Sequence, residues 1–426
     1  MITCPAWRGE RYAVLGLARS GAATVRALLA SGAEVVAWDS DEAKRNVEGA
    51  SYADPTTIDL TGFAGVVASP GVPLNRHPIA AKARDADVPV IGDIELFAQA
   101  REYMPSHRVV GITGTNGKST TTALIHHIVE TAGISARLGG NIGLPILGEE
   151  PLPLGGIYVL ELSSYQIDLT HSLDCDVAVL LNLTPDHLDR YDGFEGYAAS
   201  KARLFAMQSK DHDAVIGIGD AASAAIARTL SSRGEHLHKI APGVCMDQSR
   251  WPSLQGPHNA QNALAAIAAC QALGVPEAAI DAGLESFKGL PHRMERVGVV
   301  NGVAYVNDSK ATNPDSTAPA LAAFDRIHWI LGGQAKTDNL DACRPSFGHV
   351  CAAYTIGEAG MLFRDLLSND IPTTYAENLT DALDLARAAA EPGDTVLLSP
   401  ACASFDQFRD YEDRGDTFRG LVEAMA

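Results

Sequence analysis

The sequence predicts an α/β protein of three domains, each built on a mostly parallel sheet, from three observations. The chain has 426 residues, enough for about three domains of roughly 150 residues. Short runs rich in Val, Ile and Leu alternate with helix-forming tracts, as in βαβ units. Several of these runs end in glycine-rich or polar turns, and ligands of open parallel sheets bind at such strand ends.

Composition and charge argue against two classes of partner. The formal net charge is −19, whereas nucleic acid is bound by clustered Lys and Arg. The start of the chain lacks the apolar core of a signal peptide, and no apolar run approaches the ~20 residues that span a bilayer. The seven cysteines are scattered without Cys-x-x-Cys spacing, which fits a reducing compartment. We expect a cytoplasmic monomer with neither a nucleic-acid nor a membrane partner.

The first domain, residues 1–98, is predicted to be Rossmann-like. Its expected elements are a strand and tight turn at 12–21, a helix at 22–31 and strands at 35–39, 66–72 and 88–96. The second of these strands ends on Asp39, as in dinucleotide folds. The dinucleotide fingerprint is incomplete, because Ala18 stands where a glycine would let a pyrophosphate approach the backbone.

The central domain, residues 99–296, is predicted to be P-loop ATPase-like with a parallel sheet. Residues 109–121 predict a strand, a phosphate loop and a helix, whose glycines and helix dipole favour phosphate oxygens. Lys118 supplies a mobile charge, and Ser119 supplies a hydroxyl for Mg²⁺. The loop is a variant form, since Ile112 stands where the general pattern has its first glycine.

Further strands of the central domain end in groups that suit a cation. The strand that starts at Ile157 finishes on Glu161, and Mg²⁺ is usually held by one or two carboxylates plus phosphate oxygens. Another buried strand, starting at residue 177, is followed by Asp186 and His187. Residues 197–205 then predict a helix.

The third domain, residues 297–426, is predicted to be a second Rossmann-like unit. Its expected strands are at 303–314, where the strand ends in a dense polar loop, and at 327–331, 354–357 and 395–400, with a helix at 380–390.

Two segments resemble signatures of the Mur ligase family. Residues 114–119, Gly-Thr-Asn-Gly-Lys-Ser, resemble its ATP loop, and residues 182–191 resemble its second signature. The resemblance spans nearly the whole chain and implies ATP-dependent amide formation through an acyl phosphate, with ATP and two Mg²⁺ sites. Residues 307–312 and 398–408 match the D-glutamate-adding members. This implies UDP-N-acetylmuramoyl-L-alanine and D-glutamate as substrates in peptidoglycan precursor synthesis.

The resemblance also implies roles for individual residues. The catalytic residues are Lys118, His187 and Lys201. The ATP-binding residues are Gly114, Thr115, Asn116, Gly117, Lys118, Ser119, Thr120, Asn259, Asn262, Arg293, Asp308 and Lys310. The metal ligands are Ser119, Glu161, His187 and Lys201, and Lys201 corresponds to a lysine that is carbamylated in most of the family.

Two further groups of residues are implied for the other substrates. The residues along the UDP substrate are Leu17, Ala18, Arg19, Ser20, Gly21, Asp39, Ser40, Gly71, Asn141, Ser163, Gln166 and His187. The residues that hold D-glutamate are Thr312, Lys336, Ser404 and Tyr411. The last of these departs from the family pattern, which often has Phe at that position.

Other interpretations stay open on the sequence alone. Within the family, the alternatives are a ligase for another amino acid and a folylpolyglutamate synthetase, although the latter lacks such a first domain. Outside it, the alternatives are a regulatory protein that uses the P-loop as a switch and a dehydrogenase that uses the first domain. For Asp39 the alternative to a binding role is that it only ends a strand.

Overall fold

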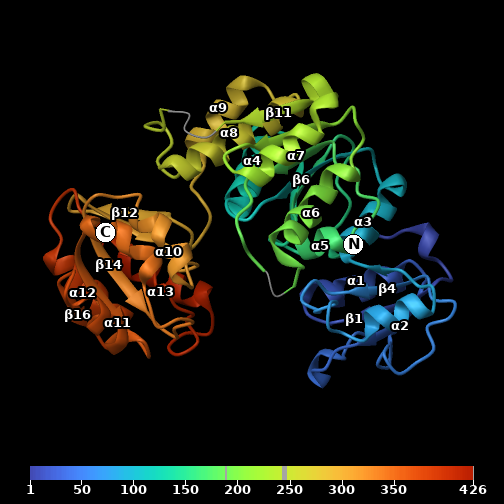
Figure 1. Ribbon diagram of the computed structural model, residues 1–426, viewed down its shortest axis with the longest axis horizontal. Helices are drawn as coiled ribbons and strands as arrows, with labels where there is room; N and C mark the ends of the chain where they lie inside the picture. The colour runs from blue at the N-terminus through green and yellow to red at the C-terminus, as the bar shows by residue number, and fades with distance from the viewer. Residues whose placement is uncertain (188–189, 242–246, 426) are drawn as a thin grey trace. The chain divides into compact units, whose positions relative to one another are not determined.

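The computed structural model describes residues 1–187, 190–241 and 247–425. The chain forms two compact units (Figure 1). Unit 1 comprises Met1–Met246 and Pro257–Ser286, and unit 2 comprises Asp247–Gly256 and Phe287–Ala426. Cys245 and positions 188 and 189 of the second signature lie outside the described residues. The described cysteines are free thiols.

Unit 1 begins with a parallel sheet in the order β3-β2-β1-β4-β5. Its elements are β1 (Arg11–Leu15), α1 (Arg19–Ala30), β2 (Glu34–Trp38), β3 (Ser51–Tyr52), β4 (Gly65–Ala68), α2 (Ile79–Asp85), β5 (Val90–Ile91) and α3 (Asp93–Ala100). This order confirms the Rossmann-like prediction. The strand predicted at 88–96 is wrong in its second half. Asp93 and Glu95 lie in the first turn of α3, where acidic side chains stabilise a helix.

The second sheet of unit 1 is also parallel, in the order β11-β10-β9-β6-β8-β7. Its strands are β6 (Arg108–Thr113), β7 (Ala136–Gly140), β8 (Ile157–Glu161), β9 (Val177–Leu180), β10 (Asp213–Gly217) and β11 (Leu237–Ile240). Its helices are α4 (Lys118–Thr131), α5 (Ser164–Asp168), α6 (Gly193–Ala206), α7 (Ala221–Thr229), α8 (Pro257–Ala272) and α9 (Glu277–Ser286). The phosphate loop follows β6, an inner strand, and α4 packs against α8 and α9.

One hydrophobic core continues from the first sheet to the second. Phe97 of α3 meets Tyr158 of β8 edge-on at 4.9 Å, and both side chains are fully buried. Glu95 accepts hydrogen bonds from the backbone N–H and the hydroxyl of Ser172 at 2.9 and 2.8 Å. Residue 98, where the first predicted domain ends, therefore falls inside a helix that packs against the second sheet. The three-domain division stays a prediction.

Unit 2 contains a sheet in the order β12-β13-β17-β14-β15-β16, parallel except for the antiparallel edge strand β12. Its strands are β12 (Glu295–Val300), β13 (Val303–Asn307), β14 (Ile327–Gly332), β15 (Val350–Ile356), β16 (Thr373–Tyr375) and β17 (Thr395–Leu398). Its helices are α10 (Pro314–Leu321), α11 (Gly360–Leu367), α12 (Leu379–Ala389) and α13 (Tyr411–Glu423). Because β13, β17 and β14 are adjacent and parallel, the loops that follow them meet at one sheet edge.

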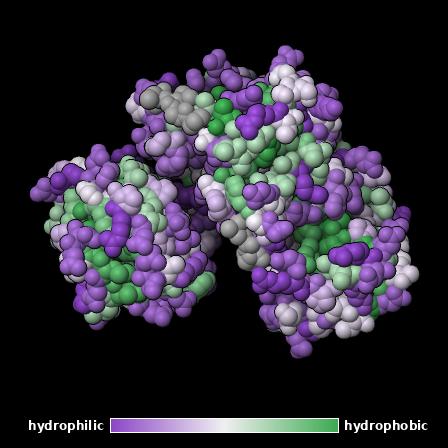
Figure 2. Space-filling model, viewed as in Figure 1, coloured by the Kyte–Doolittle hydropathy of each residue, from purple (hydrophilic) through white to green (hydrophobic). Residues whose placement is uncertain are grey.

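The face of the molecule in Figure 2 is mostly hydrophilic, with smaller hydrophobic areas on each unit. Large apolar side chains that are exposed in unit 2 include Met361 and Leu362 of α11, at 47% and 41% exposure. Within the described residues, every helix is too short or too polar to cross a bilayer.

Candidate active site

The phosphate loop joins β6 to α4. Gly114 and Gly117 have φ values of 146° and 85°, a region that L side chains rarely adopt. Ile112 is fully buried and belongs to β6, which runs to Thr113. The loop therefore turns at Gly114, which explains why the general pattern's first glycine is not needed. A Cβ at Gly117 would come within 2.3 Å of Asn262 Oδ1 on α8, so glycine lets that amide approach the loop.

Asn182, the first residue of the second signature, holds the phosphate loop. Its backbone carbonyl accepts the Thr115 N–H at 2.9 Å. Its side-chain oxygen accepts the Asn116 N–H at 2.9 Å, and its Nδ2 donates to the Asn116 carbonyl at 3.1 Å. Lys118 Nζ donates to the carbonyls of Gly114 and Thr115 at 2.9 and 2.7 Å. The loop is thus preorganised at the N-terminus of a 14-residue helix, as an anion site requires.

Glu161 fits a cation at the neighbouring strand end. Glu161 is the last residue of β8 and pairs with Ile112 of the adjacent strand β6. Its side chain is 1% exposed. Its Oε1 accepts from Asn141 Nδ2 at 2.8 Å, while its Oε2 is buried with no hydrogen-bond partner among the described residues. A buried carboxylate oxygen without a partner is costly, and a magnesium ion would satisfy it. Ser119, the predicted hydroxyl ligand, is buried in the first turn of α4.

The described residues contain no cluster of three or more His, Cys, Asp or Glu side chains placed to hold a metal. A hard cation at Glu161 would therefore take its other ligands from hydroxyls, phosphate oxygens and water, as Mg²⁺ usually does.

A cavity of about 390 Å³ lies beside the loop. Of the predicted site residues, it is lined by Gly71, Lys118, Asn141, Ser163, His187 and Lys201. Gly71 lies in the loop that follows β4, so the first sheet contributes to a cavity built mainly by the second. Tyr165, Asp186 and Tyr197 also line it, and their roles were not predicted.

Lys201 is the most unusual group in this cavity. Its side chain comes from α6 and is 2% exposed. Its Nζ donates to Thr113 Oγ1 at 3.2 Å and lies 4.9 Å from the centre of the Tyr197 ring. Burial, followed by the charge of Lys118, lowers the pKa of Lys201 to about 7. A substantial fraction of this amine is neutral, and hence nucleophilic, at neutral pH.

His187 and Ser163 lie on loops around the same cavity. His187 has a φ of 53°, its Nε2 is 3.5 Å from Asp186 Oδ2, and its ring centre lies 5.0 Å from that of Tyr165. Ser163 and Gln166 form a capping box at the start of α5. Gln166 is buried in that cap and so helps to hold Ser163 in place.

The turn after β1 brings together the residues predicted for the UDP diphosphate. The Leu17 N–H donates to Asp39 Oδ2 at 2.7 Å, and the Asp41 N–H donates to its Oδ1 at 2.9 Å. Burial raises the pKa of Asp39, but these two N–H donors together with the charges of Lys44 and Arg45 outweigh it, and the net pKa is lowered. Asp39 therefore supports the turn. A Cβ on Gly21 would come within 1.8 Å of the Gly16 carbonyl oxygen, so α1 can start at this turn only with glycine there. The predicted residues at the surface of this region are Ala18, Arg19 and Ser40.

In unit 2, three predicted ATP residues lie close together. Asp308 follows β13, is 4% exposed and accepts from Ser399 Oγ at 2.8 Å and from the Met294 N–H at 3.1 Å. Burial raises its pKa to about 7. The charge of Arg293 acts on Asp308, and Arg293 Nε is buried without a hydrogen-bond partner within the described residues. Lys310 lies two residues beyond Asp308.

The predicted D-glutamate residues surround the loops after β13, β14 and β17. Lys336 Nζ donates to Thr312 Oγ1 at 3.3 Å, and Ser404 is 2% exposed. Arg414, which was not predicted, is fully buried and donates through Nη2 to the carbonyls of Ser309 and Cys402 at 2.9 and 3.0 Å. It thereby ties the first and last of these loops together.

Comparison with known proteins identifies the family. The Mur ligase middle domain matches residues 112–243, and the Mur ligase glutamate ligase domain matches residues 292–402. The UDP-N-acetylmuramoylalanine–D-glutamate ligase of Novosphingobium aromaticivorans is 66% identical over 100% of this chain and 97% of its own length. The chain belongs to the Mur ligase family. The corresponding ligase of Zymomonas mobilis is 53% identical, with both chains fully covered.

Solved structures of Mur ligases share the fold. The UDP-N-acetylmuramate-alanine ligase of Thermotoga maritima has a TM-score of 0.58 at 16% identity, covering 98% of this chain and 100% of its own. A UDP-N-acetylmuramoylalanyl-D-glutamyl-2,6-diaminopimelate–D-alanyl-D-alanyl ligase of Acinetobacter baumannii has a TM-score of 0.57 at 17% identity, covering 87% and 92%. Mur ligases use ATP and Mg²⁺, which agrees with the phosphate loop and with the partnerless oxygen of Glu161.

Sequence reasoning missed several groups that shape this Mur ligase site. Tyr197 belongs to the predicted helix at 197–205, but nothing in its pattern showed that its ring would lie beside Lys201. Asn182 opens the second signature just after the end of a strand, which is the signal by which its loop contacts could have been anticipated.

The buried carboxyl of Asp308 leads to a prediction about stability. Its folded pKa is about 7 and its ordinary value 3.8. Between these pH values the folded chain holds a proton that the unfolded chain has released, so the free energy of unfolding falls as pH rises. We expect Asp308→Asn to be more stable than the wild type above pH 7, by up to about 4 kcal/mol. Urea denaturation at pH 5 and pH 8 measures the difference.

The matched control is Asp384→Asn. Because Asp384 is exposed on α12, this substitution should leave the free energy of unfolding nearly unchanged. A gain in stability from Asp308→Asn that is equal at both pH values would contradict the assignment to burial of the charged form.

Proposed function

We propose that this Mur ligase adds D-glutamate to UDP-N-acetylmuramoyl-L-alanine, with hydrolysis of ATP to ADP and phosphate, in peptidoglycan precursor synthesis. The observation that carries the proposal is full-length identity of 66% and 53% to ligases of that name. The cavity that joins Lys118, His187 and Lys201 to the first sheet supports it. We also propose a monomer in the cytoplasm, divided into domains at residues 1–98, 99–296 and 297–426.

The first chemical step is phosphoryl transfer. The alanyl carboxylate of the UDP substrate attacks the γ-phosphorus of ATP, the bond to the β,γ-bridging oxygen breaks, and ADP and an acyl phosphate form. The loop amides and Lys118 bind the phosphates and balance the charge that develops on them. Ser119 and Glu161 would hold Mg²⁺, which when bound supplies positive charge to the phosphate oxygens. Asn259 and Asn262 on α8 complete this side of the ATP site.

The second step forms the amide. The neutral amine of D-glutamate attacks the acyl carbon, and the tetrahedral adduct expels phosphate. A dicarboxylate needs cationic and hydroxyl donors. Lys336 and Thr312, which already share a hydrogen bond, supply one of each. Ser404 and Tyr411 complete the proposed amino-acid site, and exclusion of water protects the acyl phosphate from hydrolysis.

We propose that Lys201 is carbamylated. Its neutral amine would attack CO₂, forming an N–C bond and releasing a proton to solvent, so that a buried cation becomes an anion. The pKa of about 7 supports this step, because the neutral amine is the reactive form. The resulting carbamate and His187 would hold a second Mg²⁺, which a cationic ammonium would repel.

We propose that the UDP substrate lies along the turn after β1, with Leu17 to Gly21 at its diphosphate and Asp39 and Ser40 toward its uridine. The lactoyl-alanyl end would then reach Gly71, Asn141 and Ser163, of which all three line the cavity.

The deciding experiment is a phosphate-release assay with each component omitted in turn. We expect release of phosphate only when ATP, UDP-N-acetylmuramoyl-L-alanine and D-glutamate are all present. Release that needs no amino acid would favour a nucleotide switch. Phosphate release with another amino acid, but not with D-glutamate, would favour a ligase of the same family that adds that amino acid. L-glutamate serves as the stereochemical control.

A further inference from the structure

The segment that carries Arg293 has an unusual backbone. His292 and Met294, its neighbours on either side, have φ values of 60° and 47°. For a residue other than glycine, this region costs about 1–2 kcal/mol. Such conformations persist only where the surrounding structure over-determines them. Contacts from elsewhere in unit 2 must therefore hold residues 292–295.

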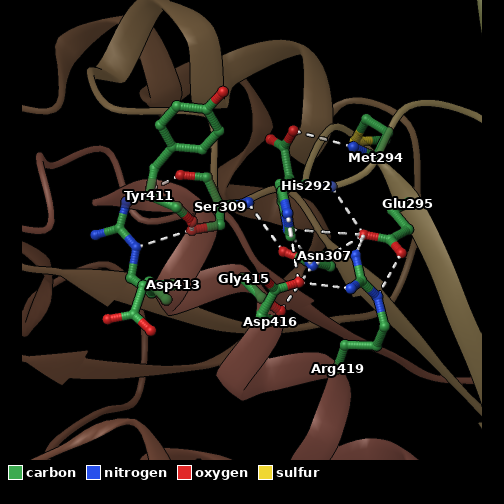
Figure 3. Close-up of polar contacts among 12 residues, drawn as sticks. His292, Met294, Glu295, Asn307, Ser309, Tyr411, Asp413, Gly415, Asp416 and Arg419 are labelled. Carbon is green, nitrogen blue, oxygen red and sulfur yellow. Dashed lines mark hydrogen bonds and ion pairs between the residues drawn. The ribbon is translucent and has the colours of Figure 1, made fainter. Parts of the chain in front are cut away.

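The Glu295 carboxylate receives the central contacts of that kind, which come from Asn307 and Arg419 (Figure 3). Its Oε2 accepts the His292 N–H at 2.8 Å and Asn307 Nδ2 at 3.0 Å. Arg419 of α13 then binds the same carboxylate at two points, with Nε to Oε1 at 2.8 Å and Nη2 to Oε2 at 3.0 Å. A two-point guanidinium–carboxylate contact fixes direction as well as distance.

The helix α13 meets the segment at two further points. A Cβ on Gly415 would come within 2.1 Å of His292 Nδ1, so glycine lets the imidazole lie directly against the helix. Asp416 Oδ1 accepts from Arg419 Nη1 at 2.6 Å and lies 3.6 Å from His292 Nε2. The guanidinium of Arg419 is thus held between Glu295 and Asp416, with its side chain 27% exposed.

The same segment is bonded to residues proposed to bind ATP. The Met294 N–H donates to Asp308 Oδ1 at 3.1 Å, and the Lys310 N–H donates to the His292 carbonyl at 2.9 Å. Arg293 itself presents a buried Nε that has no hydrogen-bond partner within the described residues, as expected of a group that awaits an anionic ligand. A continuous set of contacts therefore links Arg419 to the proposed nucleotide groups of unit 2.

We propose that Arg419 is a positioning residue for ATP. Acting through Glu295, it keeps residues 292–295 in the conformation that places Arg293, Asp308 and Lys310 for the nucleotide. It contacts none of the reacting atoms. The inference rests on the proposed function only in taking ATP as the ligand of these groups.

The test compares Arg419→Gln with the wild type by equilibrium ATP binding in the presence of Mg²⁺ and by steady-state kinetics. We expect the Kd and the KM for ATP to rise about tenfold, while the KM values for D-glutamate and the UDP substrate change less than about twofold. Arg419→Lys keeps the charge but loses the two-point contact. The Kd and the KM for ATP should therefore rise less in this variant, by about threefold. If Arg419→Gln does not fold, Arg419→Lys carries the same comparison.

The matched control is Arg344→Gln, which removes another arginine of unit 2 that bridges two carboxylates, Asp341 and Asp370. It should leave ATP binding unchanged. The proposal is overturned if Arg419→Gln leaves the Kd for ATP unchanged, or if it raises all three KM values equally. Because ATP binding is measured directly, a wild type without D-glutamate-dependent phosphate release would refute the proposed function and leave this comparison intact.

Discussion

Replacing Lys118 with alanine is expected to lower kcat/KM for ATP on the order of 10³-fold. The phosphate loop offers N–H groups and a helix dipole to the nucleotide, but Lys118 supplies its full positive charge. The folded structure should survive, because the hydrogen bonds that Nζ donates to the carbonyls of Gly114 and Thr115 stay within the loop itself. Phosphate release at varied ATP, together with a thermal melt, measures both expectations.

The control for this variant is Lys239→Ala, since Lys239 is exposed on the edge strand β11. It should retain wild-type kinetics. A Lys118→Ala enzyme with activity within about tenfold of the wild type would mean that the loop binds phosphate through its backbone alone, and the proposed role would be wrong.

Replacing Lys201 with alanine is expected to lower kcat on the order of 10²-fold, and short carboxylic acids should restore part of the activity. Alanine leaves a space in the cavity beside Thr113 and Tyr197, where acetate or formate could supply the anionic oxygens that the carbamate would provide. The measurement is the rate of phosphate release with increasing acetate, at constant ionic strength with chloride as the reference anion.

Lys210→Ala is the control, because Lys210 is an exposed lysine shortly after α6. Undiminished activity of Lys201→Ala would exclude any role in catalysis. A loss that neither acetate nor formate reverses would leave Lys201 essential as an amine and would contradict carbamylation.

The fold could be predicted from the sequence because its signals are local. Apolar strands that end in polar turns predict the α/β class. The turn at Gly114 can be predicted because glycine is free to adopt positive φ. The edge strand β12 was missed, because a strand that pairs antiparallel at a sheet edge depends on its partner β13 more than on its own pattern. The start of α3 at Asp93 was missed because an apolar run there continues from strand into helix.

The residues of the candidate site could be predicted from the sequence, but their burial, their pKa values and their long-range contacts could not. The depth of Lys201, and hence its pKa, depends on the packing of α6 against the second sheet. Likewise, Glu295 and Arg419 are separated by 124 residues, and no local pattern relates two such distant positions. The hydrogen bond from the Leu17 N–H to the Asp39 carboxylate could not be predicted either, because it depends on how the turn folds.

The continuous core beneath the first two sheets constrains how this enzyme can change. Phe97 and Tyr158 fill a common interior, so a substitution that loosens one sheet also disturbs its neighbour. The surface proposed to take the nucleotide sugar and the surface proposed to take ATP must therefore be inherited as a pair. Exchange of the first sheet alone between related enzymes would leave mismatched side chains at their shared centre.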